Sequence, residues 1–375
     1  MKIGINASFL NNKPTGVGVF TQEVMKGLCN LDKDTTVFSS IQVEGVNEAQ
    51  MQLTPTHIRG SLNVVNNIGR AVFDNALLRY RLKAAAVEVL FCPIMEFPLT
   101  YVLPTVVMVH DLHPLYFPEQ FGLAGKYFKF SLGMLKRLRY RVVTESNFVK
   151  AEVVKTAGLQ EELIDVITLG YDPEFFKPRG IEQQEGFLRK HDLKAPFILF
   201  VGSLFPYKNV STLIDAFLLI KNRVPHTLVI IGKQDLAAKP LIKDKRIVYK
   251  SYVERQDIPY FYSYADMLVH PSLFEGFGLN ILEAMACGTP VISSNGGSLP
   301  EVVGDAGLLF NPKEVTTLAT LMLKLIRNQE LRQSLINRGL KHVKKFTWDK
   351  AAIGIYNACK KCLDDSRREK EGGRR

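Results

Sequence analysis

Two carboxylates at a fixed spacing are the strongest chemical signal in the sequence. Glu275 and Glu283 have seven residues between them in the segment FEGFGLNILEAMACGTP, which contains a Gly-Phe-Gly turn, Gly276–Gly278. The glycines let the backbone turn tightly and approach a ligand closely. The apolar helix expected from Leu279 would offer unpaired N–H groups and a positive dipole end, which suit a phosphate or pyrophosphate. A sugar joined to a nucleoside by a pyrophosphate would meet Glu275 at its sugar end and Glu283 at its ribose end.

Further candidate residues in the first half of the chain follow predicted strands. Gly16 and Gly18 lie in PTGVG, which follows the first strand and resembles a shortened phosphate-binding loop, although a plain βα connection stays open. The strand TVVMVHDLHP ends in His110 and Asp111. A histidine at such a strand end can donate to a sugar hydroxyl or share a developing charge. For His113, an ordinary structural role is the better interpretation.

In the second half, Ser203 and Lys208 follow the strand FILFVG and precede a helix. The charge of Lys208 opposes the dipole at a helix N-terminus, so its place favours an anion between lysine and helix. A solvated surface lysine is the alternative. The segment ISSNGGSLPEVV places Glu301 after another strand. There it could contact a base or ribose; an ordinary acid at a helix start is the alternative.

Composition limits the classes of protein. A chain of 375 residues with 46% hydrophobic residues predicts two domains. Its net charge of +11 and pI of about 9.3 favour polyanionic partners. Zinc-binding and RNP-like patterns are missing, so we expect no nucleic acid partner. The sequence contains no run of eighteen apolar residues, so we expect no membrane span.

The remaining signals favour a cytoplasmic protein. The five cysteines are an odd number and do not suggest a set of disulfide pairs. Only Cys359 and Cys362 have a CxxC spacing, so we interpret all five as ordinary thiols. The start, MKIGINASFL, alternates like a strand and is not expected to be a signal peptide.

Strands and helices alternate in two successive series, which predicts parallel sheets covered by helices. A helix is expected at Val17–Leu31, and the segment Tyr171–Pro178, with its two prolines, is a plausible linker. The expected strands are Lys2–Ala7, Val87–Phe91, Thr105–Val109, Val142–Thr144 and Ile164–Thr168, then Pro196–Gly202, His226–Gly232, Arg246–Val253, Ala265–Pro271 and Thr289–Ser294. In such sheets ligands bind at the carboxyl ends of the strands.

Together these motifs resemble the retaining glycosyltransferases with the GT-B fold, and more narrowly the EX7E group (glycosyltransferase family 4, glycosyl transferases group 1). The resemblance rests on EGFGLNILEAMACGTPVISSNGGSLPEVVGDAGLL, on the loop Gly16–Gly18, on HDL at His110 and on VGSLFPYKN. It implies an α/β fold of two Rossmann-like domains facing across a central cleft. The implied parts are an acceptor-side domain at 1–177, a nucleotide-sugar domain at 178–347, a helix at about 348–365 packing back on the first domain, and a disordered basic tail at 366–375.

The resemblance also implies roles for the site residues. Glu275 would bind hydroxyls of the donor sugar, Glu283 would bind the ribose, and Lys208 would neutralise the leaving diphosphate. His110 would contact the donor sugar and Gly16 would place an amide near the phosphates. The remaining donor-binding positions would be Gly18, Ser203, Gly276, Phe277, Gly278, Leu279, Asn280 and Ile281, with Asp111 and Glu301 as further candidates. Relatives often carry an arginine where this chain has Ser203 or Tyr207. Either Lys208 works with less help, or another cation such as Arg255 or Lys233 substitutes.

The implied activity is metal-independent, retaining transfer of a hexose, without a cofactor, to a hydroxyl of a glycan or lipid-linked acceptor in surface polysaccharide assembly. The nucleotide sugar is itself a substrate; GDP-mannose is favoured, followed by UDP-glucose or UDP-N-acetylglucosamine. A GT-B epimerase or phosphorylase and a non-catalytic sugar-nucleotide-binding protein are the alternatives.

A basic amphipathic segment adds a membrane hypothesis. Residues 126–141, KYFKFSLGMLKRLRYR, hold six basic residues and no acid among aromatic and leucine side chains. Such a helix can lie on an anionic membrane, which would place the protein peripherally at the inner face of the cell membrane. An ordinary helix covering a sheet stays open as the alternative.

Overall fold

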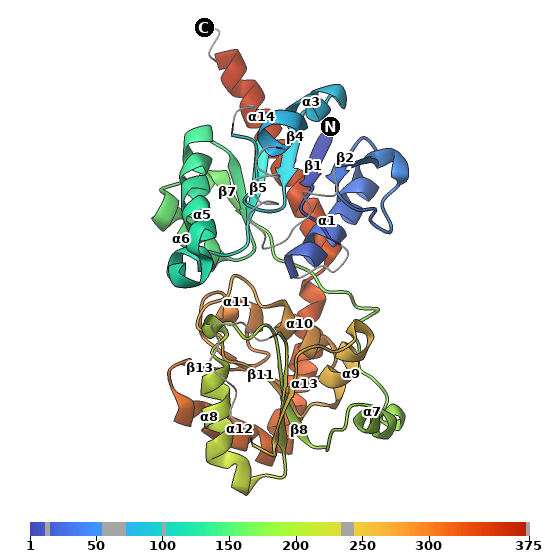
Figure 1. Cartoon of the computed structure of the whole chain (residues 1–375), viewed down its shortest axis with the longest axis vertical. Coiled ribbons are helices and arrows are strands. Elements are labelled where there is room, and N and C mark those ends of the chain that lie inside the picture. Colours follow the sequence, from blue (N-terminus) through green and yellow to red (C-terminus); the bar gives the residue numbers. More distant parts are fainter. Residues whose placement is uncertain (12–15, 55–72, 100–102, 234–243, 373–375) are drawn as a thin grey trace. The chain divides into compact units, whose positions relative to one another are not determined.

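The protein consists of two compact units. The computed structural model describes residues 1–11, 16–54, 73–99, 103–233 and 244–372. One unit comprises Met1–Gly170 together with Thr347–Arg375, and the other comprises Tyr171–Phe346 (Figure 1). The chain therefore leaves the first unit at Gly170, slightly before the predicted boundary at 177, and returns to it for its C-terminal helix.

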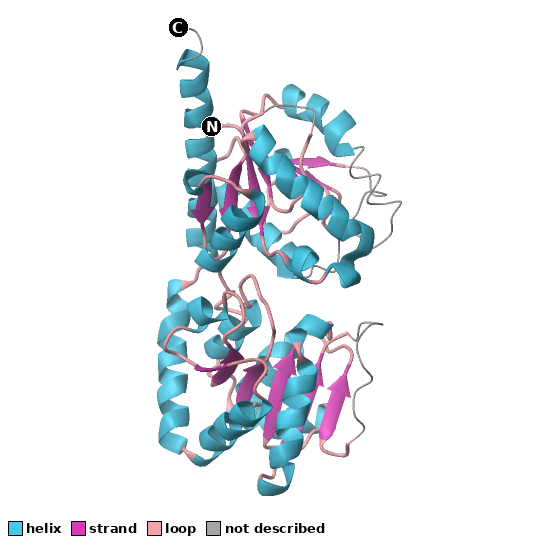
Figure 2. Ribbon diagram, turned by 90° about the vertical axis from the view of Figure 1, so that its left-hand side faces the viewer, coloured by secondary structure: helices cyan, strands magenta, loops and turns pink. Residues whose placement is uncertain are grey.

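The N-terminal unit is built on a parallel sheet whose described strands follow the order β3-β2-β1-β4-β5-β6-β7. Its central strands are buried along their whole length and consist mostly of apolar residues. This is expected where helices cover a parallel sheet on both sides (Figure 2). The strands are β1 (Ile3–Ala7), β2 (Thr36–Ser39), β3 (Met51–Leu53), β4 (Val89–Cys92), β5 (Thr105–Val109), β6 (Arg141–Thr144) and β7 (Ile164–Val166).

Helices cover this sheet. They are α1 (Gly16–Leu31), α3 (Leu78–Ala84), α4 (His113–Tyr116), α5 (Pro118–Leu138), α6 (Asn147–Ala157) and α14 (Trp348–Gly372). The C-terminal helix α14 packs against α1 (Figure 1). It also carries Asp365, which pairs at 2.8 Å with the buried guanidinium of Arg141 on β6, and Asp165 on β7 pairs with the same group at 2.7 Å. A buried arginine needs such partners because an uncompensated buried charge is strongly destabilising.

The C-terminal unit is also built on a parallel sheet, whose described strands follow the order β10-β9-β8-β11-β12-β13. The strands are β8 (Phe197–Val201), β9 (Thr227–Ile231), β10 (Ile247–Lys250), β11 (Met267–His270), β12 (Val291–Ser294) and β13 (Leu308–Phe310). The helices are α7 (Gln184–Lys190), α8 (Val210–Ile220), α9 (Ile258–Tyr264), α10 (Leu279–Ala286), α11 (Leu299–Val303), α12 (Val315–Arg327) and α13 (Gln329–His342).

The strand order reverses once in each sheet, and ligands of doubly wound folds bind at such switch points. The reversal lies between β1 and β4 in the first sheet and between β8 and β11 in the second. In the second sheet the loop after β8 carries Lys208 and the loop after β11 carries Glu275, so the topology brings these two predicted site residues to one place.

Every predicted strand overlaps a strand of the structure, but three observed strands were not predicted: β2, β3 and β13. The disordered tail predicted at 366–375 is wrong for residues 366–372, because α14 continues to Gly372; residues 373–375 lie outside the described part of the chain. Arg, Glu and Lys favour helix, and Arg367 and Glu369 also pair with Glu88 and Arg139.

The packing of α1 on α14 predicts an unusual response to Gly27→Ala. A Cβ at Gly27 would lie 2.4 Å from the Cβ of Ala352, far inside contact distance. Replacing glycine by alanine within a helix usually stabilises by about 1 kcal/mol, whereas forcing extra volume into a packed interface costs about 1–3 kcal/mol. We therefore expect Gly27→Ala to lower the free energy of unfolding in urea titration.

The matched control is Gly133→Ala on α5. A Cβ there meets no atom within 4 Å, so the ordinary gain in helix stability should appear. Equal stabilisation of both variants would contradict the tight contact between α1 and α14.

Candidate functional site

The carboxylate of Glu275 is the centre of a buried polar cluster. Its Oε1 accepts hydrogen bonds from Lys208 Nζ at 2.5 Å and Ser272 Oγ at 2.6 Å, and it lies 3.1 Å from His270 Nε2. The side chain of Glu275 is 8% exposed and that of Lys208 is 16% exposed. Burying a carboxylate is costly unless it is paired and hydrogen-bonded, and here three donors surround one oxygen.

The backbone of Glu275 is fixed by the loop after β12. Ser298 donates to the Glu275 carbonyl through its N–H at 3.1 Å and its Oγ at 3.0 Å. A Cβ at Gly297, whose φ is +65°, would lie 2.4 Å from that carbonyl oxygen and 2.8 Å from the Glu275 nitrogen. Glycine is therefore required at position 297 for the two loops to meet, and the Gly-Gly pair acts here by close packing.

The helix α10 begins as the sequence predicts. Gly278 has φ +100° at the N-cap position, and no side chain caps the helix. The carboxamide of Asn280 in its first turn donates to the Val201 carbonyl at the end of β8, at 2.9 Å. This bond joins α10 to the neighbouring strand, so the N-terminus of α10, Glu275 and Lys208 all lie at the switch point.

Glu283 has a different environment from Glu275. Its Oε2 accepts a hydrogen bond from the hydroxyl of Tyr262 on α9 at 2.9 Å. Burial raises the pKa of Glu283 from 4.5 to about 7, while the Tyr262 hydrogen bond and the charge of Arg255 oppose this rise. The two carboxylates therefore differ: Glu275 is bonded directly to a cation, and Glu283 only to a neutral hydroxyl.

The loop after β8 holds Ser203 and Lys208 in the predicted order. Lys208 ends a short 3-10 turn just before α8, and the negative group beside it is Glu275. Two cations were candidates to substitute for the arginine missing near Lys208. The Lys233 carbonyl accepts from the Leu204 N–H, which places Lys233 beside this loop, whereas Arg255 acts on Glu283.

His110 in the N-terminal unit has a partner at each ring nitrogen. Nδ1 lies 2.9 Å from Oε2 of Glu145, and Nε2 lies 2.9 Å from the Pro93 carbonyl. Burial by itself lowers the pKa of His110, but the hydrogen bond and charge of Glu145 outweigh burial and raise it. With two acceptors at its nitrogens, the ring is suited to the doubly protonated imidazolium form.

The other candidates take simpler places. Asp111 pairs with His113, Oδ2 to Nδ1 at 2.8 Å, and accepts its N–H at 3.0 Å, so both residues fix the start of α4. Burial raises the pKa of Asp111, but the bonds to His113 outweigh this and lower it. Gly16 and Gly18 lie in the first turn of α1, and Pro14 and Thr15 of their loop lie outside the described residues. Glu301 is exposed in the first turn of α11.

Sequence reasoning did not assign the supporting residues of the site. Tyr262, Glu145 and Ser298 hold Glu283, His110 and the Glu275 backbone respectively. Ser298 stands in the same long signature as Glu275, whereas Tyr262 and Glu145 stand in no recognisable motif with their partners. The place of Glu145, just after β6 and next to the strand that ends at His110, was the one available signal.

Comparisons with known proteins give a family match within the second unit. Residues 183–342, less than half of the chain, match the family model of glycosyl transferases group 1. The whole chain has the GT-B fold: it superposes on HepE of Anabaena in complex with UDP and glucose, with a TM-score of 0.72, 18% identity and coverage of 95% of this chain and 98% of that one. For sucrose-phosphate synthase of Thermosynechococcus elongatus the TM-score is 0.75, with 16% identity and 97% and 99% coverage.

Relatives by sequence include glycosyltransferases of O-antigen chains. The chain is 33% identical over 229 residues to O-antigen chain mannosyltransferase B of Escherichia coli, covering 58% of this chain and 60% of that protein. It is 29% identical over 266 residues to O-antigen chain mannosyltransferase RfbU of Salmonella typhimurium, covering 67% and 69%. The alignments span less than two thirds of the first relatives, and only 32% of the serotype-specific mannosyltransferase WbdA of Escherichia coli.

The raised pKa of Glu283 predicts a pH-dependent cost to the stability of the C-terminal unit. The native carboxyl titrates near 7 and the unfolded one near 4.5, so stability is lost as pH rises through this range. Glu283→Gln keeps an acceptor for Tyr262 and removes the titration. We expect its gain in unfolding free energy over the parent protein to be about 2 kcal/mol larger at pH 8 than at pH 5.5, measured by urea titration at both values.

Glu330→Gln is the control, because Glu330 is an exposed acid on α13. Its effect should be the same at both pH values. A pH-independent effect of Glu283→Gln would show that Glu283 is ionised in the native protein at pH 5.5.

Proposed function

We propose that the protein is a retaining glycosyltransferase that moves a hexose from a nucleoside diphosphate sugar to a hydroxyl of a glycan or lipid-linked acceptor. The observation that carries the proposal is the bond between Lys208 and Glu275 beside the start of α10. A cation, a helix N-terminus and a carboxylate acceptor meet there at a switch point. A diphosphate and a sugar need those three groups side by side.

The contacts support a division of roles. Lys208 has three N–H donors, so it can keep its bond to Glu275 and also donate to a diphosphate oxygen. The N–H groups at Leu279 and Asn280 would bind the same phosphates, and Glu275 would accept from sugar hydroxyls. Glu283, joined to an uncharged hydroxyl, is suited to the ribose hydroxyls. Lys233 is the proposed second cation near the phosphates.

Charge placement is the proposed source of catalysis. The departing diphosphate gains negative charge in the transition state, and preorganised donors aimed at such charge are usually the largest catalytic term. Lys208 and the α10 N-terminus supply that stabilisation without a metal ion. The diphosphate would act as the base for an acceptor that attacks from the same face of the sugar. His110 is proposed as a contact of the donor sugar, held as an imidazolium by Glu145.

The relatives favour particular substrates. Two of them are O-antigen chain mannosyltransferases, which supports GDP-mannose as donor and surface polysaccharide assembly as the process. UDP-glucose and UDP-N-acetylglucosamine are the next donors to test. An epimerase or a non-catalytic binding protein is less favoured, because the same relatives are transferases.

Peripheral membrane binding through α5 is part of the proposal. Leu132 and Leu135 on its inner face are buried, as in any helix that covers a sheet. Its outer face carries exposed Leu123, Tyr127 and Phe130 at helical spacing among lysines. An apolar stripe flanked by basic residues is suited to the surface of an anionic bilayer, so the enzyme would work at the cytoplasmic face of the membrane. Within the described residues no helix has the length and hydrophobicity to cross a membrane.

The function is tested by following GDP release from GDP-mannose in EDTA, first with the parent protein and then with Lys208→Ala. The parent should turn over without added metal. Loss of one well-placed donor to a developing anion costs about 2.7–4 kcal/mol, so Lys208→Ala should lower kcat about a hundredfold or more. Lys221→Ala, which breaks a different ion pair with Asp244, should stay near the parent rate.

Three results would contradict parts of the proposal. A loss below tenfold in Lys208→Ala would remove Lys208 from the site, and strict dependence on Mn²⁺ or Mg²⁺ would overturn metal-free catalysis. An inverted anomeric configuration in the product, measured by NMR coupling constants, would overturn retention.

Membrane binding is tested by flotation with vesicles of phosphatidylglycerol and phosphatidylcholine. The parent protein should float at low salt and dissociate in high salt, because part of the attraction is electrostatic. Tyr127→Ser combined with Phe130→Ser should abolish flotation. Ile353→Ser on α14, another exposed apolar residue, should not affect flotation. Flotation that survives the double substitution would exclude this face of α5 as the contact.

A further inference from the structure

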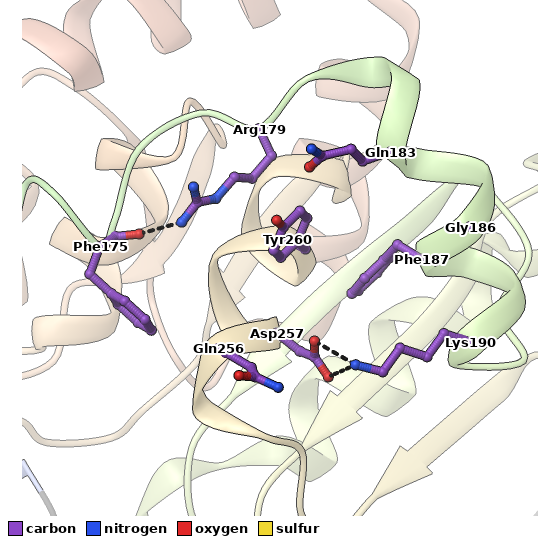
Figure 3. Close-up of a pocket in the computed structure, with 9 residues that line it drawn as sticks. All are labelled: Phe175, Arg179, Gln183, Gly186, Phe187, Lys190, Gln256, Asp257 and Tyr260. Carbon is purple, nitrogen blue, oxygen red and sulfur yellow. Dashed lines mark hydrogen bonds and ion pairs between the residues drawn. The ribbon is translucent and has the colours of Figure 1, made fainter.

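A cavity lies in the C-terminal unit, between α7, the start of α9 and the segment around Phe175 and Arg179. Its volume is about 540 Å³, within the range of small-molecule sites, and it opens to solvent. Figure 3 shows its lining: Phe175, Arg179, Gln183, Gly186, Phe187, Lys190, Gln256, Asp257 and Tyr260. None of these residues belongs to the cluster around Glu275, so the proposed transfer site does not account for this cavity.

Aromatic rings form one part of the lining. Tyr260 and Phe187 are nearly parallel, with centroids 5.8 Å apart and planes at 20° (Figure 3). The Arg179 guanidinium lies over the Tyr260 ring at 5.1 Å. Rings and planar guanidinium groups offer flat apolar surfaces with polar edges. The C–H face of a sugar ring packs on such a surface.

Polar groups complete the lining. The side chains of Gln183 and Gln256 are exposed, and each carboxamide can both donate and accept. Arg179 uses one terminal nitrogen, Nη2, to donate to the Phe175 carbonyl at 2.8 Å. Its other terminal nitrogen, Nη1, makes no hydrogen bond within the described ranges. Donors and acceptors at the edge of an aromatic surface suit a ligand with many hydroxyls.

The charged groups of the lining are largely compensated. Lys190 donates to both oxygens of Asp257 at 2.8 Å, so its charge is compensated within the wall. Asp257 also precedes the first residue of α9, where a carboxylate occupies the helix end that an anion would prefer. Arg179 makes no ion pair among the described residues, and Arg255 lies over the ring of Phe175 at 5.1 Å. Guanidinium groups also donate to hydroxyls, so the lining suits an uncharged ligand with many hydroxyls.

We propose that this cavity is a binding site for an uncharged oligosaccharide, separate from the donor site. A sugar ring would pack on Tyr260 while its hydroxyls bond to Gln183, Gln256 and Arg179. This inference rests on the proposed function only in taking the oligosaccharide to be part of the glycan acceptor. A site away from the reacting sugar would hold an inner part of that chain.

The test uses α-linked mannotriose as the probe, with binding measured by saturation-transfer NMR and titration calorimetry on the full chain. The parent protein should bind it. Gln183→Ala combined with Gln256→Ala removes exposed side chains with no packing role and should weaken binding about tenfold or more, as expected for two lost hydrogen bonds. Tyr260→Ala should weaken it further, and its melting curve will show whether the fold is intact.

Control variants separate this site from the transfer site. Gln160→Ala combined with Gln329→Ala, two exposed glutamines elsewhere, should bind mannotriose as the parent does. Glu275→Ala should also retain binding, and the thermal shift given by GDP should be unchanged in the Gln183/Gln256 variant. Unchanged mannotriose affinity in that variant, or loss of binding in Glu275→Ala, would overturn the proposal.

Failure of the two ideas is distinguishable. A parent protein that releases GDP from GDP-mannose but does not bind mannotriose keeps the proposed function and overturns the second site. A parent protein that binds mannotriose through Gln183 and Gln256 but turns over no donor keeps the site and overturns the transferase.

Discussion

The buried contact between Lys208 and Glu275 is the constraint on which the site depends. A carboxylate that is 8% exposed requires compensation, and it receives it from residues on two sides of the switch point: Lys208 after β8, and His270 and Ser272 at the end of β11. Because Ser298 holds the backbone of Glu275, the loop after β12 is bound to the same cluster. Three loops thus have one preferred arrangement, and a donor would meet a preorganised set of groups.

The two carboxylates of the motif, Glu275 and Glu283, are of one residue type but have different environments. Glu275 has a direct cationic partner, since its carboxylate lies 2.5 Å from Lys208 Nζ. Glu283 has only the Tyr262 hydroxyl, and burial raises its pKa to about 7. A polar ligand that donates hydroxyls would improve the environment of Glu283, since each added donor stabilises its ionised form. The spacing alone contains none of this difference.

Most strands and the start of α10 could be predicted from the sequence because they depend on local residue patterns. Buried runs such as Thr105–Val109 consist mostly of apolar and β-branched residues, and glycine at 278 marks the start of α10. The strand β3 was missed because it has no fully buried residue to mark it. Tyr262 and Glu145 could not be assigned because their partners lie 21 and 35 residues away and are brought together only by helix packing and strand order. The tail was predicted to be disordered because it is highly charged, although its Arg, Glu and Lys residues also favour helix.

In both units a histidine at the end of a strand lies beside a glutamate, but the two pairs differ chemically. His110 has acceptors at both nitrogens, and the hydrogen bond and charge of Glu145 raise its pKa. His270 shares its glutamate with Lys208, and among the described residues its Nδ1 has no hydrogen-bond partner. Through Nε2, His270 contacts the same carboxylate oxygen that Lys208 binds. In the N-terminal unit the histidine supplies the positive charge; in the C-terminal unit the lysine does, and the histidine positions the carboxylate.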